Sequence, residues 1–267
     1  MKILDTIVCV LVCVAMISLL FCGIPNSVKG AIDESSVVAV WLFDEGSGQV
    51  AYDSSENGNG AVFQGAPEWV EGKFGKALWF NGSSDYVAAP DSESLDINGE
   101  QLSIVAWING EGWPAANHVV RKVADGDTSA IYILRVQPET VRIYLNTGGE
   151  DEITDGVTVL PLNEWTHVAM VYDGAEVRIY VNGELDGSKP QSGEVRQSDN
   201  ELRIGRGEPA GYFLGSIDEV AIFASALAEG DIREIMETGL SRLVLPVESV
   251  GRLTAKWAEI KVLRWIF

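Results

Sequence analysis

The stretch that decides the fold runs from Trp165 to Leu185 and reads WTHVAMVYDGAEVRIYVNGEL. Two pairs in it, Asp173-Gly174 and Asn182-Gly183, tolerate the positive φ angles that tight hairpin turns require. Between these turns apolar and polar residues alternate, which is typical of a strand with one buried face. The apolar residues of that face are Val177, Ile179 and Val181. The stretch therefore predicts three antiparallel strands joined by two turns.

Similar short runs, rich in Val, Ile, Tyr and Trp, occur along the chain between further Asn-Gly and Asp-Gly pairs. The predicted strands are Val37–Phe43, Leu102–Ile108, Ile131–Val136, Val141–Leu145, Trp165–Tyr172 and Val177–Val181. Short strands spaced by turns are typical of an antiparallel sandwich or barrel. One stretch, from Leu227 to Glu237, has the apolar pattern of a helix, and Gly239 stands where its C-cap belongs. We expect an all-β fold with one short C-terminal helix.

The first thirty residues differ from the rest of the chain. Lys2 precedes an apolar run from Ile7 to Ile24, and small residues follow up to Gly30. This is the pattern of a secretory signal peptide, residues 1–30, although a run of this length also suits an uncleaved membrane anchor. All three cysteines lie in this segment, so the mature domain is expected to hold no disulfide.

The mature chain divides into a main domain at 31–240 and a basic tail at 241–267. The formal net charge of the whole chain is −20, and 46% of its residues are hydrophobic, enough for a sizeable buried core. An acidic surface repels nucleic-acid phosphates and anionic lipids. We therefore expect no nucleic-acid partner and no membrane contact by the mature domain.

Six stretches stand in an order that is typical of one fold family. They are VWLFDEGSG at 40–48, DSSENGN at 53–59, GKALWFNG at 75–82, SIVAWI at 103–108, the Trp165 hairpin and FLGSIDEV at 213–220. Over residues 37–240 the series resembles the laminin G-like branch of the concanavalin A-like lectin/glucanase jelly rolls. The resemblance implies two stacked antiparallel sheets, one of them concave, with the first and last strands as neighbours.

Catalysis is not expected. Some glucanases of the resembling superfamily carry Glu-x-Asp-x-x-Glu on a strand, and this pattern occurs here once, from Glu229 to Glu234. It falls in the predicted helix, where Glu229 and Asp231 point roughly 200° apart and cannot flank one glycosidic bond as paired carboxylates must. A Ser-His-Asp relay would need His118 or His167 beside a nucleophile. We read the pattern as an exposed helix face and predict that the protein is not an enzyme.

Oxygen-bearing side chains gather in the loop after the first strand. Asp44 ends that strand, Asp53 and Asn57 follow it, and Asp218 lies in the last long strand, which the resemblance places next to the first. Calcium takes six to eight oxygen ligands from carboxylates, amides and carbonyls. These four residues are therefore our candidate calcium ligands. The alternative is that Asp and Asn here only shape turns.

Ligand binding by this kind of fold needs an aromatic platform on a sheet face or in an end loop. Trp113 stands in the loop after the strand that contains Trp107, where packing explains a Trp less readily than in a strand. Further candidates on the middle strands are Tyr132, Arg135, Tyr144 and Asn146. The strand residues Trp41, Trp79, Trp107 and Trp165 are expected in the core. For the candidates too, packing is the alternative role.

The sequence thus predicts an exported, non-catalytic binding module, secreted or placed at the cell surface or in the periplasm. Its expected partner is a carbohydrate or glycoprotein, bound by aromatic stacking and by hydrogen bonds, with calcium as a structural ion. Two alternatives remain: a structural or adhesive surface protein without a small ligand, and a divergent glycoside hydrolase of the same fold. Loops vary widely on this fold, so the ligand cannot be named from the sequence.

Overall fold

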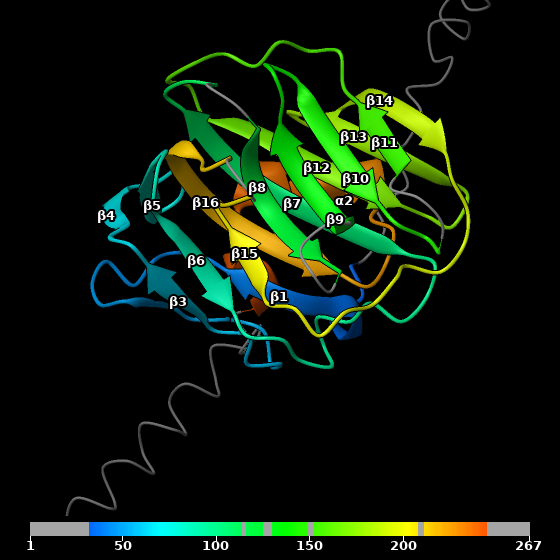
Figure 1. Ribbon diagram of the computed structural model, residues 1–267, viewed down its shortest axis with the longest axis horizontal. Helices are drawn as coiled ribbons and strands as arrows, with labels where there is room; N and C mark the ends of the chain where they lie inside the picture. The colour runs from blue at the N-terminus through cyan, green and yellow to red at the C-terminus, as the bar shows by residue number, and fades with distance from the viewer. Residues whose placement is uncertain (1–31, 114–115, 125–129, 149–151, 208–210, 245–267) are drawn as a thin grey trace, which may run out of the picture.

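Two eight-stranded antiparallel sheets face each other across one hydrophobic core (Figure 1). The computed structural model describes residues 32–113, 116–124, 130–148, 152–207 and 211–244. The predicted signal segment at 1–30, and the part of the predicted tail beyond residue 244, lie outside the described residues.

The first sheet, called sheet A, contains the stretch that decided the fold. Its strands in spatial order are β14 (Glu184–Pro190), β13 (Glu176–Val181), β12 (Thr166–Tyr172), β7 (Leu102–Gly110), β16 (Leu214–Phe223), β5 (Lys76–Asn81) and β4 (Glu68–Glu71). Strand β1 (Val37–Trp41), which follows the short 3-10 turn η1 (Glu34–Ser36), also pairs with β16. The first and last long strands are therefore neighbours, as the resemblance implied.

The second sheet, called sheet B, supplies the other layer. Its strands in spatial order are β11 (Glu152–Asp155), β10 (Val141–Leu145), β9 (Ala130–Val136), β8 (Asn117–Val123), β15 (Leu202–Ile204), β6 (Tyr86–Ala89), β3 (Ala61–Gln64) and β2 (Val50–Ala51). All six predicted strands are confirmed within two residues at each end. Strand β1 ends at Trp41, two residues before the predicted end at Phe43. Phe43 adopts a φ of 55°, which a strand does not accommodate.

The inner faces of both sheets form the main core. Along β12, Val168, Met170 and Tyr172 point into it, while Ala169 and Val171 belong to a second apolar cluster on the outer face of sheet A. Trp41 is fully buried in the main core, and its indole donates to the carbonyl of Asn59 at 2.9 Å. A buried indole needs such an acceptor, since an unpaired polar group in the core is costly.

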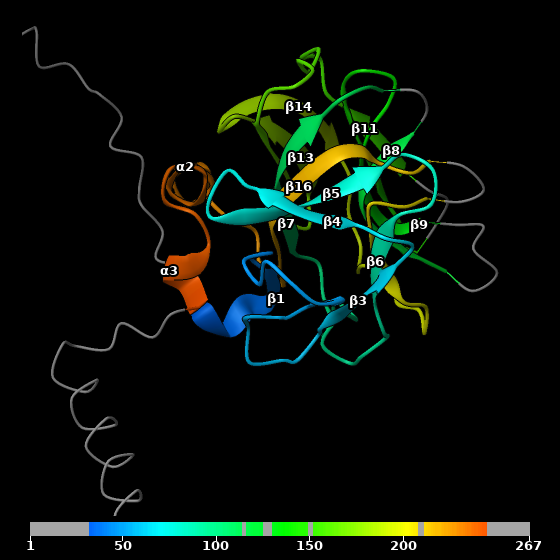
Figure 2. The same ribbon diagram turned by 90° about the vertical axis from the view of Figure 1, so that its left-hand side faces the viewer.

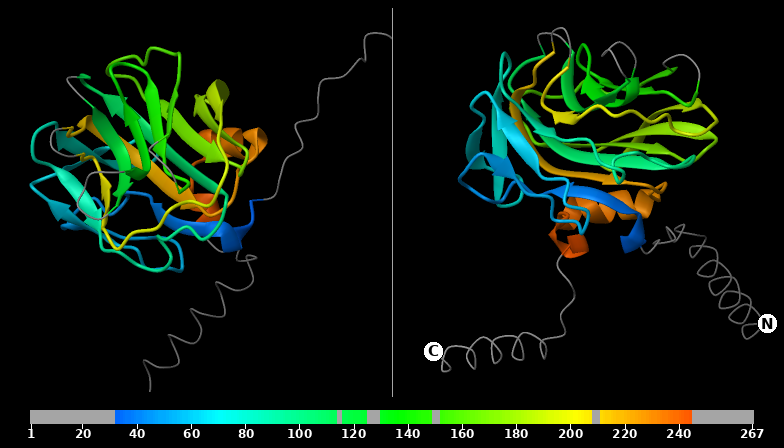
Figure 3. Two further views of the ribbon diagram at one scale, coloured as in Figure 1. Left: turned by 45° about the vertical axis from the view of Figure 1, so that its right-hand side comes forward. Right: turned by 60° about the horizontal axis from the view of Figure 1, so that its bottom comes forward.

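Two helices close the outer face of sheet A (Figure 2). Helix α2 (Glu229–Thr238) buries Ile232 and Ile235 against it, and α3 (Ser241–Val244) follows after Gly239, whose φ of 76° ends α2 where the sequence predicted. In Figure 3 these helices lie with β1 at one side of the sandwich. The part of the chain that the structure describes holds no helix long and apolar enough to cross a membrane.

One expectation about α2 is corrected. The Glu-x-Asp-x-x-Glu pattern does lie on the helix, but its middle residue is not exposed: Asp231 is 4% exposed. Its carboxylate accepts from the backbone N–H of Ala228 at 3.3 Å, so it caps the first turn of α2. Glu229 pairs with Arg233 one turn later at 2.5 Å. Asp231 and Glu229 of this pattern therefore stabilise the helix, by capping and by an ion pair.

Candidate functional site: an arginine- and tyrosine-bearing sheet face

The outer faces of the two sheets differ in what covers them. Helix α2 packs on sheet A, whereas sheet B lies on the opposite side of the sandwich, and no described helix covers it (Figures 1 and 2). Strand alternation places Arg135 of β9 and Tyr144 of β10 on this outer face, because their neighbours Leu134, Val136, Ile143 and Leu145 fill the main core.

Arg135 and Tyr144, both predicted from the sequence, are in contact. The guanidinium carbon of Arg135 lies 4.3 Å from the centroid of the Tyr144 ring, within the range of a cation–π interaction. One terminal nitrogen of Arg135 donates to the Tyr144 hydroxyl and to Gln137 Oε1, and the other lies 3.4 Å from His118 Nε2. These contacts hold the planar group in one orientation above the sheet.

His118 completes this group and is electrically neutral. It is 3% exposed, and burial, followed by the nearby charges of Arg135 and Arg121, lowers its pKa to about 3. Since a guanidinium only donates, Nε2 must accept from Arg135 and the proton must sit on Nδ1. The loop after β15 lies close above the ring: a side chain at Gly207 would place its Cβ 2.2 Å from His118, so only glycine fits there.

A second arginine–aromatic group borders the same face. The Arg206 guanidinium lies 4.7 Å from the centroid of the Tyr86 ring and 5.4 Å from that of Tyr212. The two tyrosine rings are 6.4 Å apart. Tyr86 points outward from β6, because Val87 fills the core. The sequence reasoning missed these three residues, which come together from two distant segments.

Three more arginines share the outward side. Arg203 of β15 stands opposite Arg121 of β8, and Arg142 of β10 stands opposite Arg135. We call the whole set the arginine–tyrosine face; it comprises Tyr86, His118, Arg121, Arg135, Arg142, Tyr144, Arg203, Arg206 and Tyr212. Three of its arginines showed a signal in the sequence, an arginine flanked by apolar residues, as in LRV at 134–136, VRI at 141–143 and LRI at 202–204. Such a surface can offer planar hydrogen-bond donors beside aromatic rings.

Two of the predicted ligand-binding residues lie inside the molecule instead. Tyr132 is fully buried, and its hydroxyl donates to the carbonyl of Leu95 at 3.3 Å, so it packs the core. Asn146 is 1% exposed, and its side-chain oxygen accepts from the N–H of Gly148 at 3.0 Å, which shapes the turn after β10. A shallow groove lies beside this turn, and its lining includes Thr147, Glu194 and Gln197.

Trp113, the leading loop candidate, is half-buried and packs against the main core. Its ring lies 6.1 Å from that of Phe213 at an interplanar angle of 68°, an edge-to-face contact. Its indole nitrogen lies 3.4 Å from the carbonyl of Leu160. These are packing contacts, as in the alternative that the sequence left open, and a binding role for Trp113 stays a prediction.

The four tryptophans that were predicted to lie in the core differ in their burial. Trp41 is in the main core, and Trp107 is buried at 5% exposure on the outer side of sheet A, where its ring meets His167 edge-on at 5.3 Å. Trp79 and Trp165 are only half-buried, which corrects their assignment to the core. Trp79 points outward and donates to Glu111 at 2.8 Å.

The predicted calcium ligands form two separate sets. Asp53 accepts from the backbone N–H groups of Val40, Ser55 and Asn59 at 2.8 to 2.9 Å, and from the Ser55 hydroxyl at 2.7 Å. The Asn57 amide donates to the carbonyls of Val37 and Val38, both at 2.9 Å. This set ties the loop to β1, which is a turn-shaping role.

The other set holds the turn between β4 and β5. Asp44 accepts from the N–H of Lys76 at 2.7 Å, and Asp218 accepts from the N–H of Phe74 at 3.0 Å. Burial raises the pKa of Asp218 to about 8 and that of its neighbour Glu219 to about 7. Across the described ranges, no three carboxylate, histidine or cysteine side chains converge as metal ligands do. Calcium binding stays a prediction that these contacts do not support.

His167 is not placed for catalysis. It is 1% exposed, and burial lowers the pKa of its ring to about 3. Neither ring nitrogen has a hydrogen-bond partner among the described residues. It lies beside Trp107 and across from Asn182, which accepts from its backbone N–H at 2.9 Å. A buried neutral ring of this kind packs the sheet, as the sequence reasoning assumed by default.

Together these features define a two-sheet jelly roll with helices packed on the outer face of sheet A. Residues 81–233, more than half of the chain, match the family described as the concanavalin A-like lectin/glucanases superfamily, and the chain belongs to this superfamily. This confirms the resemblance inferred from the six sequence stretches. No curated protein matches the chain closely enough in sequence to count as a relative.

Several solved structures have a similar fold. Domain 4 of AbnA, a GH43 extracellular arabinanase from Geobacillus stearothermophilus, in complex with arabinotriose, has a TM-score of 0.58 and 20% identity over 75% of this chain and 98% of that one. The binding domain of botulinum neurotoxin DC, in complex with rat synaptotagmin II, has a TM-score of 0.63 and 14% identity over 77% of this chain. Botulinum neurotoxin type C, described with two ganglioside molecules, has a TM-score of 0.61 and 13% identity. The chain spans 52% of the length of each of these two toxin chains.

Proposed function

We propose that the protein is a non-catalytic carbohydrate-binding module that acts outside the cytoplasm, and that its ligand binds on the arginine–tyrosine face. The observation that carries this proposal is the group formed by Arg135, Tyr144 and His118 on the outer face of sheet B. Arg135 presents an oriented guanidinium on a half-buried aromatic ring. Carbohydrates are bound by this combination, since a ring packs on the C–H side of a sugar and planar donors reach its hydroxyls.

The similar structures support the same reading. The arabinanase domain, of which this chain covers 98%, is described in complex with arabinotriose, so this fold carries a carbohydrate on at least one other protein. The cell entry of botulinum neurotoxin type C is described as dependent on two ganglioside molecules, and this chain covers 52% of that structure. At 20% identity or less the likeness concerns the fold, and the sites need not coincide. The proposal therefore depends on the residues of this chain.

The spacing of acidic residues on the face supports a non-catalytic role. Asp155 pairs with Arg142 at 2.5 Å on β11, and Glu201 pairs with Arg203 at 2.7 Å next to β15. These strands are four spacings apart in sheet B, which is about 19 Å at a strand separation of about 4.8 Å. Paired carboxylates of glycosidases stand within about 10 Å of each other. Asp155 and Glu201 cannot act on one glycosidic bond.

The test is binding of the purified protein to a glycan array, followed by titration calorimetry on the best ligand. Arg135→Gln and Tyr144→Ala should each weaken binding at least tenfold, because each removes one half of the contact between the two side chains. The matched control is Arg178→Gln, on β13 of sheet A, where Arg178 pairs with Asp173 and Glu176. It should bind like the wild type.

Two results would overturn the proposal. If no glycan binds to the folded protein, a structural or adhesive role without a small ligand takes its place. If a glycan binds and the Arg135 and Tyr144 variants bind it normally, the site lies elsewhere on the sandwich. Hydrolysis of the bound glycan over time would contradict the non-catalytic part alone.

A further inference from the structure

Basic residues are unevenly distributed over this acidic protein. The chain carries a formal charge of −20, yet five of the nine arginines in the described ranges belong to the arginine–tyrosine face. They are Arg121, Arg135, Arg142, Arg203 and Arg206. Elsewhere a cation meets acidic neighbours, as Arg178 meets Asp173 and Glu176. The outer face of sheet B is thus the place where arginines gather.

The strand register brings these charges close together. Arg142 is the direct neighbour of Arg135, and Arg203 is the direct neighbour of Arg121. Directly opposed residues on one sheet face lie about 5 Å apart at Cβ, where like charges destabilise the sheet. The pair of Arg135 and Arg142 at the centre of the face carries such a cost. A bound anion would relieve it.

Acidic residues pair with Arg142 and Arg203, whereas none of the described hydrogen-bond partners of Arg135 is a carboxylate. Asp155 lies 2.5 Å from Arg142, and Glu201 lies 2.7 Å from Arg203. Between them stands Arg135, whose described hydrogen-bond partners are the Gln137 amide, the Tyr144 hydroxyl and the neutral ring of His118. None of these three groups carries a negative charge at neutral pH.

We propose that the ligand of this face is an anionic carbohydrate, with its acid group at Arg135 beside Arg142 and its sugar ring beside Tyr144. The inference rests on the proposed carbohydrate-binding function and names its substrate class. An arginine fork matches a carboxylate or a sulfate with two parallel hydrogen bonds, and a charge-assisted bond is about twice as strong as a neutral one. The acidic body of the protein repels other polyanions, so the anion must be presented on a ligand small enough to stay on the face.

The experiment compares matched glycans that differ only in charge, measured by titration calorimetry on the whole purified protein. The first pair is an oligogalacturonate and its methyl ester, which tests a carboxylate within the chain. Sialyllactose and lactose test a terminal carboxylate, and a heparin oligosaccharide with its desulfated form tests sulfate. At least one anionic member should bind tenfold or more tighter than its neutral partner. Its affinity should fall as NaCl rises from 50 to 500 mM, because salt screens the charge.

Variants then locate the anion. Arg135→Gln should reduce the preference for the charged glycan to less than threefold while leaving weak binding to the sugar. Arg135→Lys keeps the charge but not the planar fork, so it should recover part of the preference. Arg178→Gln is the control and should keep the full preference.

The possible outcomes separate this inference from the function on which it rests. Equal affinity for neutral and charged glycans would overturn the anionic ligand but leave the carbohydrate-binding module intact. Absence of any glycan binding would overturn both. If single-stranded DNA of equal charge binds as tightly as the best glycan, the face is a general polyanion surface and the inference is wrong.

Discussion

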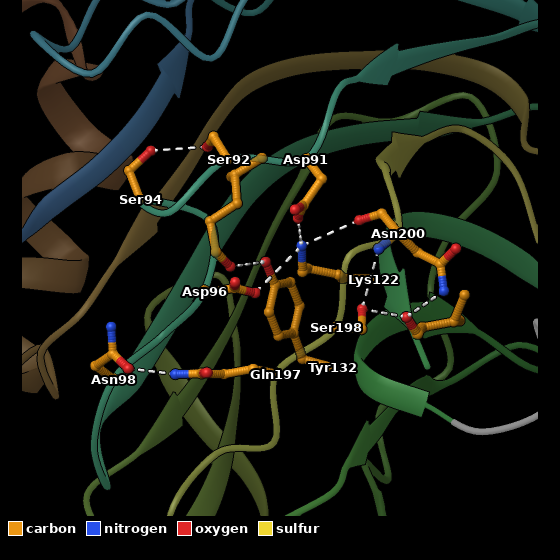
Figure 4. Close-up of polar contacts among 12 residues, drawn as sticks. Asp91, Ser92, Ser94, Asp96, Asn98, Lys122, Tyr132, Gln197, Ser198 and Asn200 are labelled. Carbon is orange, nitrogen blue, oxygen red and sulfur yellow. Dashed lines mark hydrogen bonds and ion pairs between the residues drawn. The ribbon is translucent and has the colours of Figure 1, made fainter. Parts of the chain in front are cut away.

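Lys122 and Asp91 form an ion pair inside the sandwich: Lys122 Nζ lies 2.5 Å from Asp91 Oδ1 (Figure 4). The lysine is completely buried, and its ammonium also donates to the carbonyl of Asn200 at 3.0 Å and lies 3.5 Å from Asp96. The carboxylates of Asp91 and Asp96 differ from the lysine in burial, because their side chains are 28% and 21% exposed. If Lys122 is removed, water can therefore reach the two carboxylates. If the carboxylates are removed, water cannot reach the ammonium of Lys122.

This asymmetry predicts unequal effects of substitution. The double variant D91N/D96N leaves a buried ammonium without a counter-charge and should lose about 3–5 kcal/mol of stability. Lys122→Met leaves two carboxylates that water can reach, so it should lose clearly less. Both are measured by urea denaturation. Lys189→Met breaks a surface pair with Glu152 and should change stability by less than about 1 kcal/mol. Equal losses for the first two variants would contradict the argument.

The buried histidines predict a loss of stability in mild acid. Burial lowers the pKa of both His118 and His167 to about 3, from 6.5 in the unfolded chain. Below pH 6.5 the unfolded chain therefore binds protons that the folded chain does not, and stability falls as the pH falls. Between pH 7 and 5 each ring should cost about 2 kcal/mol, at about 1.4 kcal/mol per pH unit.

His167→Leu tests the part that one ring plays. It removes a titrating group that is 1% exposed and replaces it by an apolar side chain of similar size. The variant should lose less stability than the wild type between pH 7 and 5, as followed by urea denaturation at several pH values. Parallel curves for the two proteins would show that His167 does not titrate in this range.

Asp53 predicts a structural effect that is independent of calcium. Its carboxylate accepts four hydrogen bonds that tie the loop after β1 to the strand. Asp53→Ala should lower stability by about 2 kcal/mol or more, because it leaves backbone donors without their charged acceptor. The loss should be the same with EDTA and with excess calcium. If EDTA lowers the melting temperature of the wild type but not of Asp53→Ala, the predicted calcium site exists and includes Asp53.

The fold could be predicted from the sequence because its signals are local. Alternation in Val177–Val181 and the turns at Asp173-Gly174 and Asn182-Gly183 each depend on neighbouring residues, and β12, β13 and β14 follow them closely. The helix also ended where Gly239 indicated. That the first and last strands are neighbours came from the family resemblance, since pairing of β1 with β16 joins residues far apart in the chain.

The site could be predicted only in part. Arg135 and Tyr144, two of the candidates, do lie on one face, which does not test whether they bind a ligand. Tyr132 stands three residues before Arg135 in β9, and alternation puts residues three apart on opposite faces. The alternation of side chains along a strand would alone have shown that Tyr132 and Arg135 cannot share a face. The group of Arg206 with Tyr86 could not be foreseen, because nothing local indicates that the loop after β15 crosses β6.

The same limit applies to the flanked arginines. Arg178, between Val177 and Ile179, has the same local pattern as Arg142, between Val141 and Ile143. Arg178 nevertheless lies in sheet A, next to its own acidic partners. The pattern indicates that an arginine points outward from a strand, and only the sheet order indicates which strands share a face.

Trp113 gives the last prediction, which separates packing from binding at one residue. Trp113→Ala should lower stability by about 2–3 kcal/mol, less than for a fully buried tryptophan, because the ring is half-buried against Phe213. A Cβ at Gly110 would lie 2.1 Å from Cη2 of Trp113, so Gly110→Ala should also destabilise the protein. In the double variant the second loss should largely vanish, because the ring that causes the clash is gone. Urea denaturation of the four proteins measures this coupling, and glycan binding by folded Trp113→Ala should match the wild type. If Trp113→Ala were as stable as the wild type but bound no glycan, Trp113 would be the platform that the sequence first indicated, and the ligand would lie at the end of the sandwich rather than on the arginine–tyrosine face.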